Sequence, residues 1–127
     1  MIGKWKLSGD TEGIIVYEWM EGGFFLIQHV DFQLFGHRVK AIEILGHLQP
    51  FGKAPSTDIR SRIYDSVGNT FYYVYEITED TLMIWGGEKG APAYFKGQFS
   101  ADGNTNSGAW VYPNGGGYQS IMTRIVD

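Results

Sequence analysis

Apolar and polar residues alternate in short segments along most of the chain, and turn-forming residues separate these segments at regular intervals. Turn signals occur at nine places, namely 9–13, 21–23, 35–37, 49–57, 66–69, 78–81, 86–92, 100–106 and 113–117. The intervening segments are rich in Val, Ile, Tyr, Phe and Trp, and none carries the i, i+3, i+4 apolar spacing of a long helix. The pattern therefore predicts ten short strands joined by tight turns.

A meander of antiparallel hairpins protects its edge strands by closing into a barrel. We therefore predict an all-β fold, a single antiparallel meander β-barrel of about ten strands that occupies residues 1–127 as one domain. The chain contains no linker, low-complexity tract or long internal repeat that would divide it. A twisted open sheet or a two-sheet sandwich is the alternative arrangement of the same strands.

Composition narrows the classes of function. The formal net charge is −4 and the 10 Lys and Arg residues are scattered, whereas nucleic-acid binding needs a basic stripe, so no nucleic-acid partner is expected. The chain has no Cys, which excludes disulfides, thiolate metal sites and thiol nucleophiles. No apolar run approaches the length of a membrane helix and no signal segment opens the chain, so we expect a cytoplasmic protein without a membrane partner.

Turn length predicts which side chains share one face of the sheet. A two-residue turn at Gly22–Gly23 places Tyr17 opposite Gln28, and a turn at Phe35–Gly36 places Gln28 opposite Glu43. We assign this face to the barrel interior because it carries bulky amphipathic rings of the kind that line ligand cavities. A one-residue slip in a turn would exchange the two faces.

The interior face gathers a set of candidate ligand-binding residues. Across the turn at 66–69, Arg62 is expected opposite Tyr73 and therefore inside the barrel. The full set is Tyr17, Trp19, Gln28, Glu43, His47, Arg62, Tyr73, Tyr75, Trp110 and Tyr118. Aromatic walls bury a small ligand and a few polar groups orient it, while an inward Arg62 would suit a carboxylate or phenolate. In the alternative reading, Arg62 and Glu43 pair with each other or reach solvent at the rim.

The opposite face of the same strands is also apolar. It presents Ile14, Val16, Phe25, Ile27, Ile42 and Ile44, which form a larger patch than a monomer usually leaves in water. We therefore expect a homodimer through this sheet, with Asp31 and Lys40 paired at its rim and His29 half-buried among aliphatic neighbours.

Other chemistries have less support. His29 and Asp31 could direct two ligands at one metal ion, with His37 or His47 as a third, but Asp31 already has Lys40 as a partner. No histidine is singled out as a haem ligand, so neither a metal nor another cofactor is predicted. The Gly-rich turns lack the following helix of a phosphate-binding loop, and no Ser occupies a nucleophile elbow.

Acid–base chemistry gives the alternative function. A carboxyl group in an aromatic pocket can take or give protons, so Glu43 could act with Tyr75 and with Arg62 as anchor on a phenolic or carboxylic substrate. A purely structural or interaction module is a third option. We favour binding without transformation, with a small apolar or aromatic molecule, in some cases carboxylate-bearing, as the ligand.

The two ends of the chain carry a family resemblance. The chain opens with Gly3-x-Trp5 and ends near Arg124, and in a closed meander the first and last strands are neighbours, so the guanidinium can cover the indole. This pair resembles the closing device of lipocalins and the wider calycin group. Together with "GGFFL" and "GQFSADGNTNSGAW" (97–110), it resembles an uncharacterised lipocalin-like family of small bacterial proteins. The resemblance implies a lipocalin- or fatty-acid-binding-protein-like barrel, but without the helical lid of the latter, because only "GDTEG" separates the first two strands.

Overall fold

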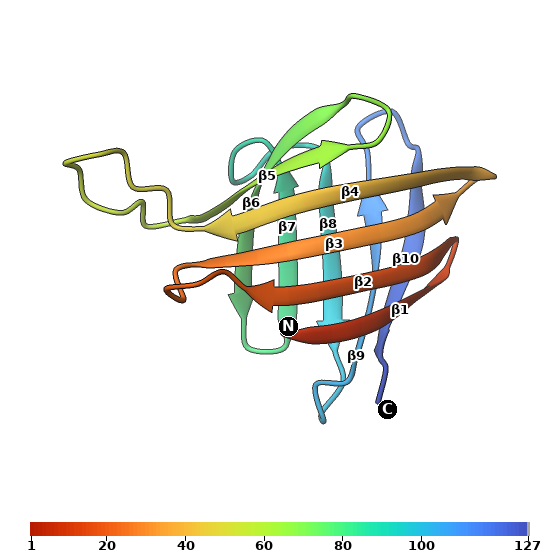
Figure 1. The fold of residues 1–127 in the computed structure, drawn as a ribbon. Helices are drawn as coiled ribbons and strands as arrows, with labels where there is room; N and C mark the ends of the chain where they lie inside the picture. Colours follow the sequence, from red (N-terminus) through yellow and green to blue (C-terminus); the bar gives the residue numbers. More distant parts are fainter. Residues whose placement is uncertain (127) are drawn as a thin grey trace.

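The computed structural model describes residues 1–126 and is a closed antiparallel barrel of ten strands (Figure 1). The strands are β1 (Gly3–Gly9), β2 (Thr11–Trp19), β3 (Phe25–Leu34), β4 (His37–Gly46), β5 (Ile59–Asp65), β6 (Thr70–Thr78), β7 (Thr81–Gly86), β8 (Tyr94–Phe99), β9 (Thr105–Val111) and β10 (Gly117–Arg124). Each strand pairs with its neighbour in sequence, and β1 pairs with β10. The predicted ten-stranded meander without a helical lid is confirmed. Across the described residues, no helix has the length and apolar character needed to cross a membrane.

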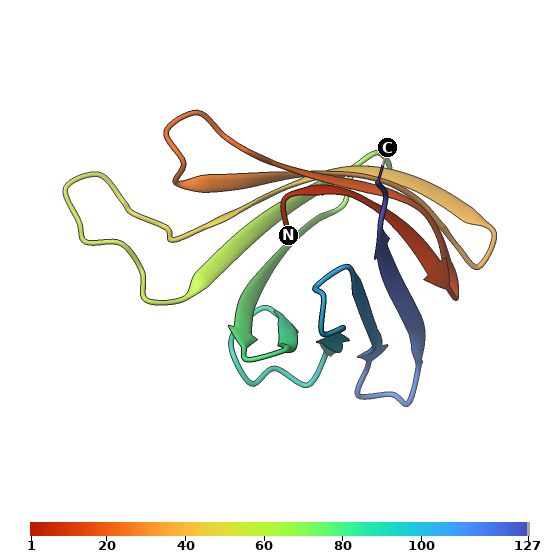
Figure 2. The ribbon, with the colours of Figure 1, turned by 90° about the horizontal axis from the view of Figure 1, so that it is seen from below.

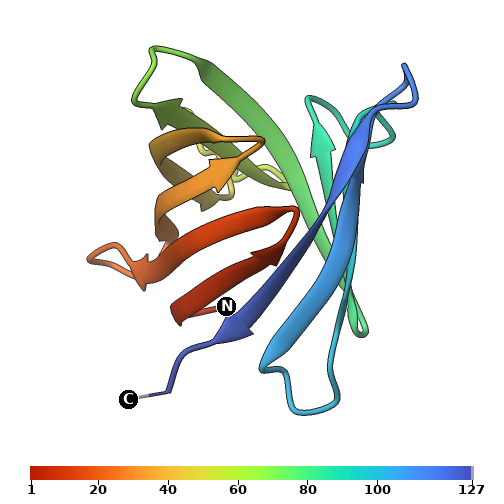
Figure 3. The same ribbon diagram turned by 90° about the vertical axis from the view of Figure 1, so that its right-hand side faces the viewer.

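The strands form two layers around the interior. In Figure 1, β1–β4 run across the direction of β7–β10. Seen from below, β1–β4 form one curved layer above the strands of the C-terminal half (Figure 2), and the side view shows the interior between the two layers (Figure 3). Strands that cross at a steep angle are typical of orthogonally packed sheets.

The meander gives the barrel two different ends. Connections after odd-numbered strands lie at one end, which we call the hairpin end, and they comprise residues 10, 35–36, 66–69, 87–93 and 112–116. The other connections comprise residues 20–24, 47–58, 79–80 and 100–104. Because β1 begins and β10 finishes beside this second set, we call it the terminal end.

The registers of the first hairpins match the predicted ones. Tyr17 lies opposite Gln28, and Gln28 lies opposite Glu43. The β3–β4 turn has φ values of 50° at Phe35 and 81° at Gly36, the positive values that a two-residue type I′ turn requires. As a result, Tyr17, Gln28 and Glu43 form one row across three adjacent strands.

The hairpin between β5 and β6 differs from the prediction by one residue. Arg62 lies opposite Tyr72 instead of Tyr73, and Ser61 takes the position opposite Tyr73. Because side chains alternate along a strand, this shift turns Arg62 outward and Ile63 inward.

The length of the β5–β6 loop explains this shift. The loop has three residues where four were expected, since the amide of Asp65 donates to the carbonyl of Asn69 at 3.0 Å. Gly68 adopts a φ of +89°, which is the left-handed conformation found in three-residue hairpin loops. The carboxylate of Asp65 also accepts the amides of Val67 and Asn69, at 3.0 and 2.8 Å. These local bonds fix the shorter loop.

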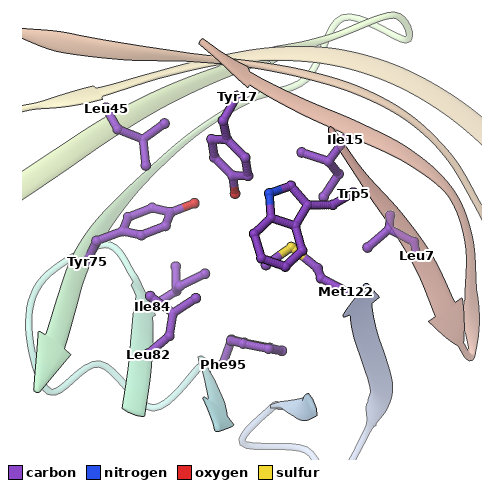
Figure 4. Close-up of a cluster of buried hydrophobic side chains, with 10 residues drawn as sticks. All are labelled: Trp5, Leu7, Ile15, Tyr17, Leu45, Tyr75, Leu82, Ile84, Phe95 and Met122. Carbon is purple, nitrogen blue, oxygen red and sulfur yellow. The ribbon is translucent and has the colours of Figure 1, made fainter. Parts of the chain in front are cut away.

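A contiguous apolar cluster lies inside the barrel (Figure 4). Its buried members are Trp5, Leu7, Ile15, Tyr17, Leu45, Tyr75, Leu82, Ile84, Phe95 and Met122. The cluster draws on both layers of strands, so burying it joins the two layers.

Trp5 and Arg124 close the terminal end as predicted. Trp5 is fully buried, and its indole N–H donates to the carbonyl of Met1 at 2.9 Å. The guanidinium carbon of Arg124 lies 4.3 Å from the centroid of the indole ring. The same guanidinium donates to the carbonyl of Ile2 and to Oδ1 of Asn104, so it ties the N-terminal segment to the β8–β9 loop.

Candidate functional site: an interior cavity

A cavity of about 170 Å³ lies inside the barrel. Its lining is mainly apolar and aromatic, and consists of Leu7, Thr11, Ile15, Tyr17, Gln28, Val30, Phe32, Glu43, Ile63, Tyr73, Tyr75, Leu82, Ile84, Phe95, Trp110, Tyr118, Ser120 and Met122. An engineered apolar cavity of about 150 Å³ holds benzene, so this cavity suits a ligand with a single ring. Of the described residues 1–126, no Lys, Arg or His belongs to this lining, and Glu43 is its single carboxyl group.

Four polar side chains meet on the cavity wall. Glu43 is only 2% exposed, and the hydroxyl of Tyr75 lies 3.0 and 2.9 Å from its two carboxylate oxygens. Gln28 Nε2 donates to the hydroxyl oxygen of Tyr17 at 2.6 Å. Figure 4 shows that the hydroxyls of Tyr17 and Tyr75 point toward each other across the interior. We refer to Tyr17, Gln28, Glu43 and Tyr75 as the polar cluster.

Burial dominates the electrostatics of the polar cluster. Loss of solvent raises the pKa of Glu43 to about 7, and hydrogen bonding from Ser61 and Tyr75 opposes this rise. The Tyr75 bond is the better-formed of the two, because the Ser61 hydroxyl has no partner at normal hydrogen-bond geometry. Burial and the charge of Glu43 raise the pKa of Tyr75 and of Tyr17. Both phenols therefore remain protonated at neutral pH. Glu43, with a pKa of about 7, is present there in both its protonated and its ionised form.

Aromatic rings surround the hairpin end of the cavity. Tyr73 and Phe95 each lie 5.7 Å from Trp110, measured between ring centroids. The contacts continue from Trp110 to Tyr112 at 6.2 Å and from Tyr112 to Tyr118 at 6.4 Å. Offset and edge contacts at these separations are the favourable ones for aromatic pairs.

We define Tyr73, Trp110, Tyr112 and Tyr118 as the aromatic rim. All four side chains are partly exposed, whereas Trp5 at the terminal end is fully buried. The cavity therefore approaches solvent at the hairpin end. The Gly-rich loops at 87–93 and 112–116 lie at this end.

The structure brings seven of the ten predicted binding residues together. Tyr17, Gln28, Glu43, Tyr73, Tyr75, Trp110 and Tyr118 all line the cavity. The shared orientation of Tyr17, Gln28 and Glu43 follows from the predicted registers and from the strict alternation of side chains along a strand, although residues 21–24 form a four-residue loop instead of the expected two-residue turn.

Three predicted residues lie outside the cavity, so the expectation that they line it is wrong. Trp19 has the inward phase of β2 but lies at the strand's last position, where it is 57% exposed. His47 follows the end of β4 and contacts the carbonyl of Ser56 at 2.8 Å. Arg62 lies on the outer surface, with its guanidinium carbon 5.4 Å from the centroid of the Tyr72 ring. It forms no pair with Glu43 inside the barrel.

Other lining residues were not among the candidates. They include Thr11, Phe32, Ile63 and Phe95. The period of two would have identified Phe32, because it lies four positions after Gln28 on β3. Phe95 lies opposite the inward Ile84 and Trp110. Ile63 required the correct loop length between β5 and β6.

The outer charged residues pair with one another. His29 is exposed instead of half-buried, and its Nε2 lies 3.0 Å from Glu18 Oε1. Asp31 accepts two bonds from Arg38, at 2.9 and 2.7 Å, although Lys40 is its cross-strand neighbour. The forked guanidinium matches both carboxylate oxygens, so Arg38 takes the place predicted for Lys40. Among residues 1–126, no three His, Asp or Glu side chains gather as a metal site would require.

The outer face of β1–β5 carries a shallow apolar groove. Ile14, Val16 and Ile42 line it, as predicted for the outward side chains of these strands. Charged residues of both signs border the groove, namely Lys4, Asp31, Lys40 and Asp65, and His29 lies beside them.

Comparison with models of known protein families gave no match to this chain, and a comparison with curated proteins gave none either. The closed ten-stranded antiparallel barrel is compatible with a calycin-like fold. The fold and its cavity therefore define the structural class, and the function has to be argued from the site.

Proposed function

We propose that the protein binds a small apolar or aromatic molecule in the interior cavity. The observation that carries this proposal is a cavity of about 170 Å³ with an aromatic rim at one end, a closed terminal end and a polar cluster on its wall. Ligand sites in small barrels combine apolar walls, which supply burial, with a few converging polar groups, which orient the ligand.

The position of Arg62 changes the expected chemistry of the ligand. A carboxylate-bearing ligand would need a cation in the cavity, and Arg62 lies outside it. An anion placed beside Glu43 would meet a buried acid without a compensating positive group, which is unfavourable at low dielectric. The proposal therefore favours ligands without a negative charge.

We also propose that the chain is lipocalin-like within the calycin group. Support comes from the Trp5–Arg124 contact at the terminal end and from the ten-stranded closure by β1 and β10. The proposal concerns architecture and does not itself name a ligand.

Acid–base catalysis is the second candidate function. A carboxyl group with a pKa near neutrality is suited to taking and giving protons, and burial raises the pKa of Glu43 to about 7. Tyr75 would hold the carboxyl group in place through its hydrogen bonds. Arg62 cannot serve as the substrate anchor from its outer position, so any anchoring would come from the polar cluster and the aromatic rim.

Native mass spectrometry of the protein purified from its own host tests the first proposal. Intact masses measured under gentle and denaturing conditions should differ by the mass of a co-purified small molecule. The same protein should then show shifted indole signals in NMR when ring-sized compounds such as toluene or benzyl alcohol are added. A protein that carries no molecule and shows no shift would contradict the proposal. The variant Glu43→Gln separates binding from acid–base catalysis. A binding protein should still bind its ligand after this change, whereas an enzyme that uses Glu43 as acid or base should lose turnover.

We further propose a homodimer through the outer groove. The groove offers an apolar strip at Ile14, Val16 and Ile42, and its border carries both lysines and aspartates. A twofold copy can place Lys4 or Lys40 of one subunit beside Asp31 or Asp65 of the other, which makes the face complementary to itself.

A further inference from the structure

The lining of the cavity is electrostatically one-sided. Glu43 is buried beside Tyr75 and close to Tyr17, and all the other lining side chains are neutral at pH 7. A buried carboxylate is stable when a positive group and hydrogen bonds compensate for lost hydration. Among residues 1–126, the lining supplies the hydrogen bond from Tyr75 but no cation. A positive charge at this position would have to come from a ligand.

The remaining walls also favour a cation. Tyr73, Trp110 and Tyr118 line the path between the polar cluster and the hairpin end, and Phe95 packs against Trp110 at 5.7 Å. The faces of aromatic rings attract ammonium groups, and more strongly where water is excluded. A cation entering past the aromatic rim would thus meet rings first and the carboxylate next.

We propose that the preferred ligand of the cavity is a small organic cation, an ammonium group attached to a single ring or short apolar chain, with the ammonium on Glu43 and the apolar part against the rings. This inference rests on the proposed function, because it names the ligand class of the same cavity. The ammonium would donate to Glu43, whose remaining partner is the hydroxyl of Tyr75. The hydroxyl of Tyr17 accepts from Gln28 and keeps its own proton for donation.

Binding of such a cation depends on pH through Glu43. The titratable groups that face it are Tyr17 on β2 and Tyr73 and Tyr75 on β6, while β3 and β5 contribute the non-titrating Gln28 and Ser61. Burial raises the pKa of each tyrosine, so all three stay neutral below pH 8. Only Glu43 changes charge in the cavity between pH 6 and pH 8.

Benzylamine and benzyl alcohol form a matched pair of probes for this proposal. They have nearly the same shape, and only benzylamine is charged in this pH range. Dissociation constants are measured by following the Trp110 indole signal in ¹H–¹⁵N spectra. We expect benzylamine to bind at least tenfold more tightly than benzyl alcohol at pH 8. Its affinity should fall by roughly tenfold at pH 6, because protonation of Glu43 removes the carboxylate.

Two variants complete the test. Glu43→Gln should abolish the preference for benzylamine and keep binding of benzyl alcohol, whereas Glu21→Gln, at an exposed position outside the cavity, should change neither. If benzyl alcohol binds as tightly as benzylamine at pH 8, or if the preference survives Glu43→Gln, the proposed cavity function stands and the cation inference is overturned. If neither probe binds the wild-type protein, both proposals fail.

Discussion

The hydroxyl of Tyr75 donates to the carboxyl group of Glu43 and lies 3.0 and 2.9 Å from its two oxygens. Glu43 lies on β4 and Tyr75 on β6, with β5 between them. The pair therefore depends on the correct phase of these three strands. It also sets the protonation chemistry of the cavity.

Replacing Glu43 by Gln should change how stability depends on pH. The pKa of Glu43 rises from its ordinary 4.5 to about 7 in the folded protein, so the folded state holds a proton that the unfolded state has released. Stability from this group is complete below pH 4.5 and is lost as pH rises through about 7. A shift of this size corresponds to roughly 3 kcal/mol. We expect the free energy of unfolding of Glu43→Gln, measured with urea, not to decline in this way as pH rises. At pH 8 it should be larger than that of the wild-type protein.

The exposed carboxylate of Glu21 provides the control for that measurement. Glu21→Gln removes the same charge in the β2–β3 loop, outside the interior. The free energy of unfolding of Glu21→Gln should decline between pH 5 and pH 8 as it does in the wild-type protein. An equal flattening in both variants would show that the decline reflects net charge instead of burial of Glu43.

Tyr75→Phe should raise the pKa of Glu43 further. The Tyr75 hydroxyl stabilises the carboxylate, so its removal favours the protonated form. A hydrogen bond to a charged group contributes about 1.5–3 kcal/mol, so the loss of stability should be greater at pH 8 than at pH 5. A ¹³C NMR titration of the Glu43 carboxyl group reads the pKa directly. Tyr73→Phe is the control, because it removes a hydroxyl from the same strand that does not bond to Glu43. It should shift the pKa of Glu43 less than Tyr75→Phe does.

Arg124→Met should weaken the terminal end of the barrel. It removes the guanidinium over Trp5 and the hydrogen bonds to Ile2 and Asn104, while the methionine keeps part of the apolar stem. We expect a loss of about 1–3 kcal/mol in the free energy of unfolding. Arg38→Met is the matched control, because its pair with Asp31 is exposed and such pairs contribute about 0–1 kcal/mol. Equal losses in the two variants would argue against a special role for the Trp5–Arg124 contact.

The sequence predicted much of the fold because local rules determine a meander. Turn signals located all ten strands, and the two-residue turn at Phe35–Gly36 fixed the phase that brings Gln28 and Glu43 together. Arg62 was misplaced because the number of residues in the β5–β6 loop depends on the bonds of Asp65, which the turn signal does not reveal. Trp19 shows a different limit, since alternation gives the direction of a side chain but not the position where the barrel ends.

The contact between Gly97 and Asn106 predicts a steep steric effect. A Cβ added at Gly97 would lie 2.1 Å from Oδ1 of Asn106 and 2.7 Å from the Phe95 ring, and all three residues are buried. Gly97→Ala should therefore lower the free energy of unfolding by about 1–3 kcal/mol or more. At Gly86 the nearest atom to an added Cβ is 3.4 Å away, so Gly86→Ala should cost far less. Combining Gly97→Ala with Asn106→Ala should cost less than the two single losses added together.

The apolar groove on β1–β5 predicts an assembly state that can be measured independently of any ligand. Ile42 lines the groove and is 46% exposed, so a carboxylate at this position would be a buried charge in a twofold interface. We expect the wild-type protein to run as a dimer in analytical ultracentrifugation and Ile42→Glu to shift it toward monomer. Phe51→Glu makes the same chemical change in the exposed β4–β5 loop, away from the groove, and should remain dimeric. A wild-type monomer at high micromolar concentration would contradict the proposed dimer, whereas equal dissociation of both variants would place the interface on another face.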